Sequence, residues 1–547
     1  MAGTVEATEY QFKPEDRPLI PGGPFAPAHP LARRLVYAAV AVLVGVTATL
    51  GNALVTVNVT SLAGSLGEYV AAVSWLPAIY VAMNASANLY LVKARMQFGI
   101  PAITHGFLIA YILAGLSQFI FPGFYAAVLV RAVCGVTAAA LTTLTIYYLL
   151  QVFPPKIRPA ALVVGISLIQ FGTPIARLFP VESLARHDWQ ALHLMEVALA
   201  CTVLAAIMFY PLPPSERTKV CTKLDFVTMA LIVPAMVLLC GALNEGRLLW
   251  WTDTHWIGWA LAAAVPLFAA AILVESRRAK PLLQLDWIGS AGILRFAAVA
   301  FLVRIALAEQ TYGAVGLLTF SGLNNEQLRL LFAIVIVALM LGTAAAILTL
   351  SQERLRYQVM VAALIIALGA WLDAHSTNLT RPAQLYASQA LIGFGTTLFI
   401  GPSLVYGFLR MLERGTEAFV SFIVTFSITQ NVGGLAGSAL LGTYQVAATR
   451  AHAVALSEHL IAADPQVAVR IQSGTGALAA AVTDPAQRAA QGAGLLSQAL
   501  TREATILAFN DTFKFVAIIA LATALYLFYL ILLNRWRERR KKMEAHP

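Results

Sequence analysis

Long apolar segments alternate with short polar segments along most of the 547-residue chain. A helix needs roughly 20 apolar residues to cross the hydrocarbon core of a bilayer. Segments of about this length recur along the chain and predict fourteen membrane-spanning helices, near residues 35–58, 72–92, 101–121, 124–151, 157–180, 190–210, 224–244, 254–274, 293–318, 327–350, 357–374, 383–409, 416–446 and 510–534.

Composition supports this assignment. Hydrophobic residues make up 59% of the chain and charged residues 12%, whereas about a quarter of the residues in a soluble domain are charged. The sequence therefore predicts an all-α, multi-pass membrane protein. Because basic residues lie in short loops, the net charge of +10 indicates topology and attraction to anionic lipid, not nucleic-acid binding.

Several common chemical signatures are absent from the sequence. The four cysteines form no CxxC pair, and no HExxH, GxSxG or GxxxxGK[ST] motif occurs. These are the frequent signatures of metal sites, hydrolases and nucleotide-binding loops. We therefore expect no enzyme activity, no cofactor and no metal site.

Basic residues are concentrated in every second loop, which predicts the orientation of the spans. Arg33 and Arg34 precede the first span, Lys156 and Arg158 follow the fourth, and the chain closes with the basic run RWRERRKK. The short loops of the other parity contain few basic residues. Since cytoplasmic loops carry the excess of Lys and Arg, both termini are predicted to be cytoplasmic.

A faint internal repeat divides the chain into halves. RAVCG from Arg131 in the fourth span matches QALIG from Gln389 in the twelfth at an offset of 258 residues, and Gln170 and Gln430 differ by 260. Two matches at nearly one offset favour duplicated six-helix halves with spans 7 and 8 inserted between them. Parallel repeats of this kind place a binding site at the interface between the halves.

These patterns predict five regions. Residues 1–34 are polar and proline-rich, which is typical of a disordered tail. The regions are a cytoplasmic tail (1–34), an N-terminal six-helix bundle (35–210), two inserted helices (211–275), a C-terminal six-helix bundle (276–534) and a basic cytoplasmic tail (535–547).

The outer loop 448–508 is long and contains two helix-start signals. Asp464-Pro465 and Asp484-Pro485 each pair an N-cap residue with proline at the first helical position. We expect two or three amphipathic helices, the last of which continues into the fourteenth span. Two roles fit this pattern: a lid over the outer mouth, or a docking surface for a periplasmic partner.

Charged residues inside the spans are the candidate functional residues. Arg304 and Glu309 lie near the middle of the ninth span, five residues apart, which is about 140° around a helix, so they do not share a face. A charge at this depth costs on the order of 2.5–3.5 kcal/mol and usually marks a transport pathway, although pairing that only holds the bundle together is the alternative. Arg177 and Glu196, on consecutive spans, are predicted to form a structural ion pair.

The fourth span and its exit carry the motif that suggests a family. Arg131-x-x-x-Gly135, AAALTTL and FPPKxR from Phe153 resemble the fourth-helix motif of the major facilitator superfamily. Together with Ser74-Trp75, Leu224-Asp225, QNVGGLAGSALLG and AFNDTF, they resemble its fourteen-span drug:proton antiporter branch, the EmrB/QacA type. The resemblance implies the major facilitator fold, two six-helix bundles plus two extra helices, in a bacterial inner membrane.

The resemblance also implies a function. It suggests a secondary active exporter that moves amphipathic or aromatic small organic compounds by alternating access and is driven by protons. Its partners would be the substrate, protons and the lipid bilayer, with a periplasmic adaptor and an outer-membrane channel in a Gram-negative cell. An uncoupled facilitator, an anion exporter or a lipid flippase of the same fold, and a membrane sensor or scaffold without transport, are the alternatives.

The sequence departs from this branch at three motifs. Gly51 stands where the first span usually has an acid, LVKARMQFG lacks the aspartate of the loop 2–3 motif, and Arg177 lies within a degraded fifth-span motif. The repeat offset of 258 carries Gly51 onto Glu309, so we expect Glu309 to be the proton-coupling acid. Arg131 is expected to act with Glu309 and to be required for turnover.

Polar residues within the apolar spans complete the predicted site. The expected lining of the substrate cavity is Asn52, Asn84, Arg304, Gln310 and Gln389.

The topology can be tested by labelling. A single cysteine placed at Ser457, in the outer loop, is expected to react with a membrane-impermeant maleimide added to intact cells. Labelling only from the cytoplasmic side would overturn the predicted orientation.

Overall fold

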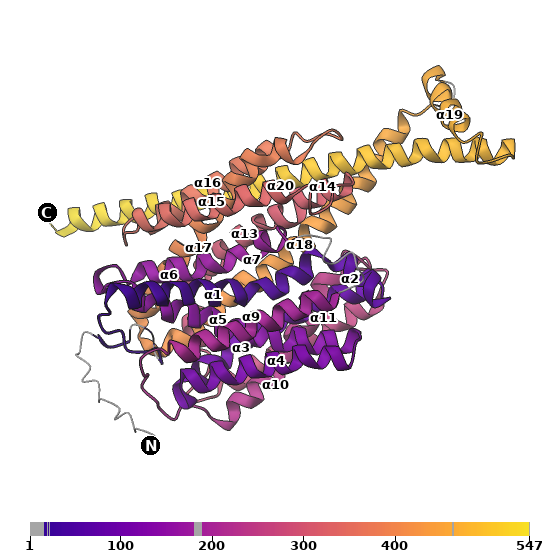
Figure 1. The fold of residues 1–547 in the computed structure, drawn as a ribbon. Coiled ribbons are helices and arrows are strands. Elements are labelled where there is room, and N and C mark those ends of the chain that lie inside the picture. The colour runs from indigo at the N-terminus through magenta and orange to yellow at the C-terminus, as the bar shows by residue number, and fades with distance from the viewer. Residues whose placement is uncertain (1–15, 19, 21, 180–188, 462–463, 546–547) are drawn as a thin grey trace.

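The computed structural model describes residues 16–18, 20, 22–179, 189–461 and 464–545, and these residues form a helical bundle. Fourteen of its helical segments are long and apolar enough to cross a membrane. Figure 1 shows the N-terminal half, in indigo to magenta, stacked against the C-terminal half, in orange to yellow. The predicted fold class is therefore confirmed.

The N-terminal half contains six spans. The fifth span is interrupted by one turn of 3₁₀ helix, η3 (Ile169–Phe171), between two short α-helices. The helices are α1 (Leu31–Val57), α2 (Val59–Leu66), α3 (Val70–Phe98), α4 (Ile100–Ile120), α5 (Phe124–Val152), η2 (Pro155–Ile157), α6 (Pro159–Leu168), α7 (Gly172–Ala176) and α9 (Trp189–Phe209).

The remaining helices form the inserted pair, α10 (Lys223–Glu245) and α11 (His255–Ser276), and the C-terminal half. The ninth span is also interrupted, here by a π-helical segment, η4 (Glu309–Ala314). The C-terminal half comprises α12 (Leu285–Ile288), α13 (Ala291–Ala306), α14 (Val315–Phe320), α15 (Arg329–Leu348), α16 (Leu355–Asp373), η5 (Pro382–Leu385), α17 (Tyr386–Arg414), η6 (Thr416–Ala418), α18 (Phe419–Glu458), α19 (Pro465–Ala477) and α20 (Pro485–Ala545).

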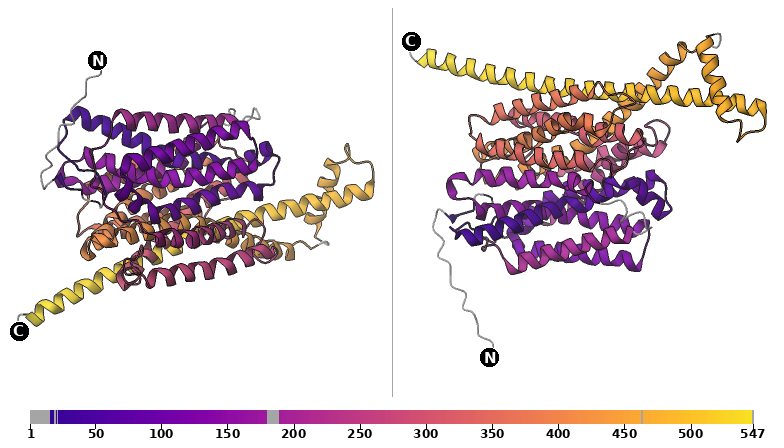
Figure 2. Two further views of the ribbon diagram at one scale, coloured as in Figure 1. Left: turned by 90° about the horizontal axis from the view of Figure 1, so that it is seen from below. Right: turned by 45° about the horizontal axis from the view of Figure 1, so that its top comes forward.

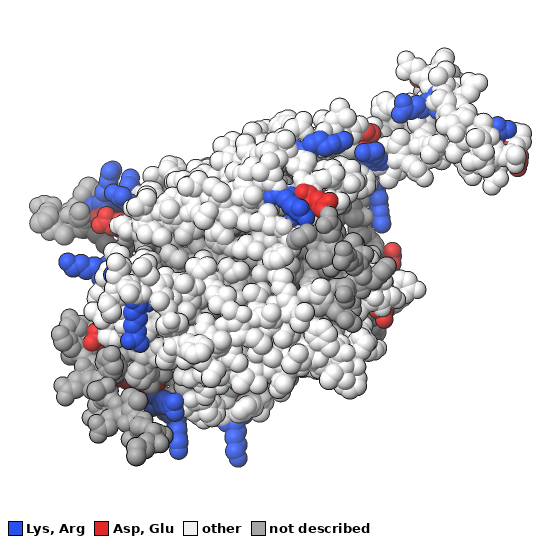
Figure 3. All heavy atoms as spheres, in the orientation of Figure 1, with Lys and Arg blue, Asp and Glu red and all other residues white. Residues whose placement is uncertain are grey.

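The surface of the bundle divides into an apolar middle and two charged ends. In Figure 3 the charged side chains on the visible face gather at the two ends of the spans, and uncharged residues cover the band between them. Large apolar side chains remain exposed on this bundle, for example Leu113, Trp259 and Leu348 at 61%, 74% and 85%. Such exposure is costly in water but favourable against lipid.

The segment before α1 differs from the expected disordered tail. The Phe25 amide donates to the Pro214 carbonyl at 3.1 Å, and the Gln151 amide donates to the Phe25 carbonyl at 3.0 Å. Arg158 donates to the Ala26 carbonyl at 2.6 Å. These hydrogen bonds to its backbone hold the proline-rich segment against the N-terminal half. Residues 1–15 lie outside the described part.

The two halves meet along α3 and α18 and along α6 and α17. Asn88 donates to Ser427 at 3.0 Å, and Asn431 donates to Asn84 at 3.0 Å. At the other contact a side chain on Gly401 of α17 would come within 2.5 Å of Val163. Small and amide residues therefore let the halves approach closely, as is usual between helices in membranes.

A buried charge network fixes the inserted helices to the N-terminal half. Asp225 of α10 accepts from Lys93 of α3 at 2.9 Å and from Arg278, after α11, at 2.6 Å. Arg278 also contacts Glu275 at 2.6 Å. Asp225 of α10 thus supplies an acid to the basic end of α3.

The long loop 448–508 forms helices, as its sequence predicts. The Asp464 carboxylate accepts from the Gln466 amide at 2.8 Å, and Asp484 accepts from the Ala486 amide at 3.0 Å. Both prolines occupy the first helical turn, and α20 continues into the last span. Figure 2 shows that the hairpin projects beyond the bundle, so it is not a lid across the bundle end.

Removing Asp225 should destabilise the protein. Asp225→Ala removes the carboxylate that contacts Lys93 and one of the two acids that contact Arg278, which should cost on the order of 1–3 kcal/mol. We expect a lower melting temperature of the purified protein in detergent. Glu326→Ala, which breaks an exposed pair with Arg329, is the matched control and should change stability by less than about 1 kcal/mol; equal effects of the two variants would contradict the network.

Candidate functional site

Two clusters of buried ionisable groups lie within the membrane-spanning part, one in each half. The N-terminal cluster is built by α4, α5 and α9, and the C-terminal cluster by η4, α16 and α17. The repeat offset relates Arg131 of α5 to Gln389 of α17. Each contacts a buried carboxyl group.

The N-terminal cluster is a charged pair. Arg131 contacts Glu196, and the two side chains are 0% and 2% exposed. Glu196 also accepts from the Tyr111 hydroxyl at 3.1 Å, and His193 lies 3.7 Å from the same carboxylate oxygen. Since the arginine offsets the carboxylate, this cluster can remain charged within the bundle.

Gly51 of α1 lies close to the Glu196 carboxyl group. A Cβ on Gly51 would lie 2.9 Å from the Tyr111 hydroxyl and 3.4 Å from the Glu196 carboxyl carbon. Thus the α9 carboxylate reaches the space that a larger residue at this position of α1 would fill. Helix α9, the sixth span, supplies the carboxylate that contacts Arg131.

The C-terminal cluster consists of two carboxyl groups and one amide. The Gln389 amide nitrogen lies 3.1 Å and 3.2 Å from the two oxygens of Glu309, and 2.7 Å from Asp373. Glu309 is 0% and Asp373 1% exposed. No basic side chain forms an ion pair with either carboxyl group among the described residues.

The backbone is unusual at Glu309, which begins the π-helical segment η4. A π-helical turn inserts an extra residue relative to an α-helix and is frequent at functional sites. A side chain on Gly313 would come within 2.8 Å of Phe513, so the widened turn packs directly on α20. The position of Glu309 therefore depends on the π-helical segment that it begins.

Arg304 lies against α18 without contacting Glu309. Its Nε donates to the Gln430 carbonyl at 3.0 Å. Side chains on Gly433 or Gly434 would come within 3.2 Å of Arg304, so the glycines of the QNVGG run make room for it. No carboxylate pairs with Arg304 in the described part of the chain.

The other predicted cavity residues lie in separate places. Asn84 bridges the two halves through Asn431, and Gln310 donates to the Gln389 carbonyl at 3.3 Å. Asn52 lies beside Gly51, and its buried side-chain oxygen has no hydrogen-bond partner among the described residues. Gln389 belongs to the carboxyl cluster, and a cavity lined by all five residues stays a prediction.

The predicted Arg177–Glu196 pair is not formed. Arg177 contacts the side-chain oxygen of Asn325 and stacks on the Phe332 ring at 5.3 Å. Asn325 in turn donates to Asn58 at 3.2 Å. The fifth span breaks near Ile169, so Arg177 is directed towards the other half, while Glu196 reaches Arg131 instead. Arg131 contacts Glu196 in this structure, and its action with Glu309 stays a prediction.

Comparisons with known proteins place the fold. No family model matches the chain, and no curated protein matches it. Solved structures do match: the human organic anion transporter MFSD10 (TETRAN) has a TM-score of 0.53 at 12% identity, covering 90% of this chain and 100% of that one.

Two further matches agree. A bacterial homologue of the human drug peptide transporters PepT1 and PepT2 has a TM-score of 0.54 at 12% identity, over 92% of this chain and 99% of its own. The major facilitator superfamily proton:xylose symporter XylE has a TM-score of 0.52 at 13% identity, covering 91% of this chain and 96% of that one. The chain has the major facilitator fold.

Three residues of the two clusters, Asp373, Tyr111 and His193, were not predicted from the sequence. Asp373 closes an apolar run, a place where an acid usually marks the membrane surface, yet α17 covers it. Tyr111 and His193 carry no pattern that separates them from packing residues. The internal repeat is the sequence signal that indicates a buried polar group in α17, because it relates Gln389 to Arg131.

The Arg131–Glu196 pair can be tested by a double-mutant cycle. Arg131→Met leaves a buried carboxylate without its cation and should cost about 3–5 kcal/mol in stability. Adding Glu196→Gln should recover most of this loss, because the remaining groups are neutral. Melting temperatures in detergent measure both effects; simple additivity of the two changes would show that the side chains do not interact.

Proposed function

We propose that the protein is a secondary active exporter that couples outward movement of amphipathic or aromatic organic compounds to inward movement of protons. The Glu309–Gln389–Asp373 cluster is the observation that carries this proposal. Exporters of this fold work by alternating access, in which two halves rock around a site between them. The basic loops favour cytoplasmic termini, in the inner membrane of a bacterium.

The cluster is suited to bind one proton. Two ionised carboxylates that share one amide donor repel each other, and no described cation offsets the repulsion. A proton held between Glu309 and Asp373 removes this repulsion. The Gln389 amide then donates to both groups and keeps them together.

Release of the proton requires a change in the surroundings of Glu309 and Asp373. A change in the helical geometry of η4 would provide it. Glu309 is the first residue of the π-helical segment, so conversion of one turn between π and α geometry would rotate its carboxyl group away from Gln389. Water that reaches the separated acids would stabilise their charged forms. Proton binding and the position of the ninth span are thereby linked.

The charged pair in the other half has a different role. Arg131 and Glu196 are already balanced, so this pair does not need a proton to be stable. We assign it to hold α5, α9 and α1 in register while the halves move. Arg131 is therefore a positioning residue, and proton coupling is assigned to the C-terminal half.

Arg304 favours a second candidate function, export of organic anions. It has no carboxylate partner in the described part of the chain, and the nearby Gln430 amide has both polar atoms buried without partners. Buried polar groups in this state commonly contact water or a ligand. An anion would satisfy Arg304, whereas a cation would be repelled by it.

Proton coupling can be measured in everted membrane vesicles. Ethidium, as a cationic probe, and fluorescein, as an anionic probe, are added to vesicles with a preformed pH gradient, and dequenching of a pH-sensitive dye reports substrate-induced proton movement. We expect Glu309→Gln and Asp373→Asn each to reduce this movement at least tenfold with normal insertion. The change should be specific to coupling, so probe exchange without a gradient should persist.

Glu326→Gln, an exposed acid paired with Arg329, is the matched control and should retain wild-type proton movement. Movement at the wild-type rate in both Glu309→Gln and Asp373→Asn would overturn the proposal. A response to fluorescein and none to ethidium, lost in Arg304→Gln, would establish the anion-exporting alternative.

A further inference from the structure

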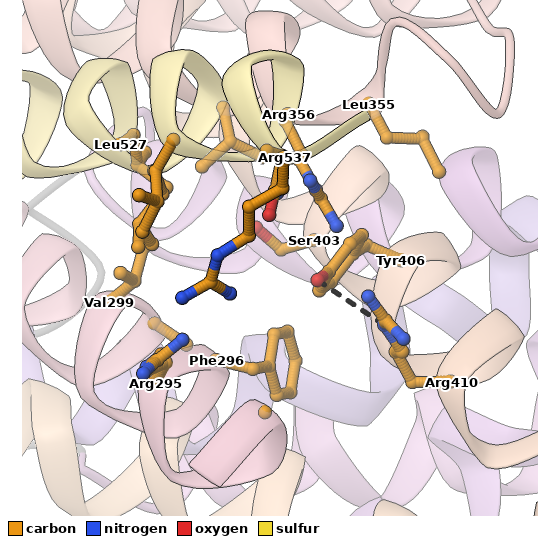
Figure 4. A pocket seen from close by; sticks show the side chains of 16 residues that line it. Arg295, Phe296, Val299, Leu355, Arg356, Ser403, Tyr406, Arg410, Leu527 and Arg537 are labelled. Atoms are coloured by element: carbon orange, nitrogen blue, oxygen red, sulfur yellow. Dashed lines mark hydrogen bonds between the residues drawn. The ribbon is translucent and has the colours of Figure 1, made fainter. Parts of the chain in front are cut away.

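A cavity of about 150 Å³ lies in the C-terminal half, away from both buried clusters. It is enclosed by α13, α16, α17 and α20, near the end of the bundle from which α20 runs to the C-terminus. Four arginines line it, Arg295, Arg356, Arg410 and Arg537. In Figure 4 the guanidinium groups of Arg295 and Arg537 point towards one another, while Arg356 and Arg410 flank the Tyr406 ring.

The positive charge of this cavity is scarcely neutralised by the protein. Arg410 contacts Glu413 at 2.8 Å, and both side chains are exposed. Arg356 stacks on Tyr406 at 5.6 Å, which provides no negative charge. Arg295 and Arg537 have no carboxylate partner among the described residues. Four cations from four helices therefore converge on one cavity with a single acid beside it.

The cavity has a charged mouth and an apolar interior. Arg295 lies near the start of α13, and Val299, about 6 Å further along this helix at 1.5 Å per residue, is apolar. On α20 the charged residue is again at the mouth and the apolar residues lie inside. Arg537 is followed inward by Leu530 and by Leu527, which is about 15 Å from Arg537 along the helix. A ligand that fits both parts has an anionic head and a hydrocarbon chain.

We propose that this cavity binds an anionic phospholipid, with its phosphate between the arginines and an acyl chain along α20. Arginine forks match phosphate oxygens, and basic pockets between membrane helices are suited to anionic head groups. An inorganic anion would satisfy the arginines but leave the apolar wall unfilled. The bound lipid would join α20 to the other three helices and stabilise the C-terminal half.

The purified full-length protein in detergent provides the test. Its melting temperature is measured with phosphatidylglycerol, cardiolipin, zwitterionic phosphatidylcholine, or sodium phosphate at matched ionic strength. We expect a rise of several degrees with the two anionic lipids only. In Arg295→Gln/Arg537→Gln this rise should disappear, and the number of phosphatidylglycerol molecules retained in native mass spectrometry should fall.

The matched control is Lys156→Gln/Arg277→Gln, which removes two exposed cations at the same end of the bundle but outside the cavity. It should keep the response to anionic lipid. Equal stabilisation by phosphatidylcholine, an equal rise with sodium phosphate, or an unchanged rise in Arg295→Gln/Arg537→Gln would each overturn the proposal. Both altered arginines are exposed, so elution of the variant as a single symmetric peak checks its folding.

Discussion

Buried carboxyl groups need partners within the protein, because lipid hydrocarbon offers neither hydrogen bonds nor counter-ions. Glu196, Glu309 and Asp373 are each at most 3% exposed, and the packing around them follows from how this need is met. Glu196 receives an arginine, a tyrosine hydroxyl and a nearby histidine. Glu309 and Asp373 share the amide of Gln389, and no basic side chain among the described residues forms an ion pair with either acid.

This difference breaks the symmetry of the two halves. The offset that relates Arg131 to Gln389 replaces a permanent cation by a neutral amide at corresponding places of α5 and α17. A cation fixes the charge state of its partner, whereas an amide accommodates either a protonated or an ionised acid. One half thus holds a balanced charged pair, and the other holds two acids that share one amide.

The periphery of the molecule uses charge differently. The charges of Asp225, Glu275, Lys93 and Arg278 balance where the inserted helices join α3, which makes this contact a structural one. The arginines around the α20 cavity are not neutralised in this way. Charges that the protein leaves without partners are the ones that point to ligands, and this criterion links Arg304 with the α20 cavity.

The sequence by itself determined the fourteen spans, the helices before the last span and the place of Glu309 as an acid inside a span, because hydropathy, capping residues and an acid within an apolar run are local signals. Only the tertiary structure decided the partners. Arg177 and Glu196 lie on consecutive spans, yet the break in the fifth span turns Arg177 to Asn325. Asp373 became a partner of Glu309 because helix packing, which side-chain direction and crossing geometry set, brings distant residues together.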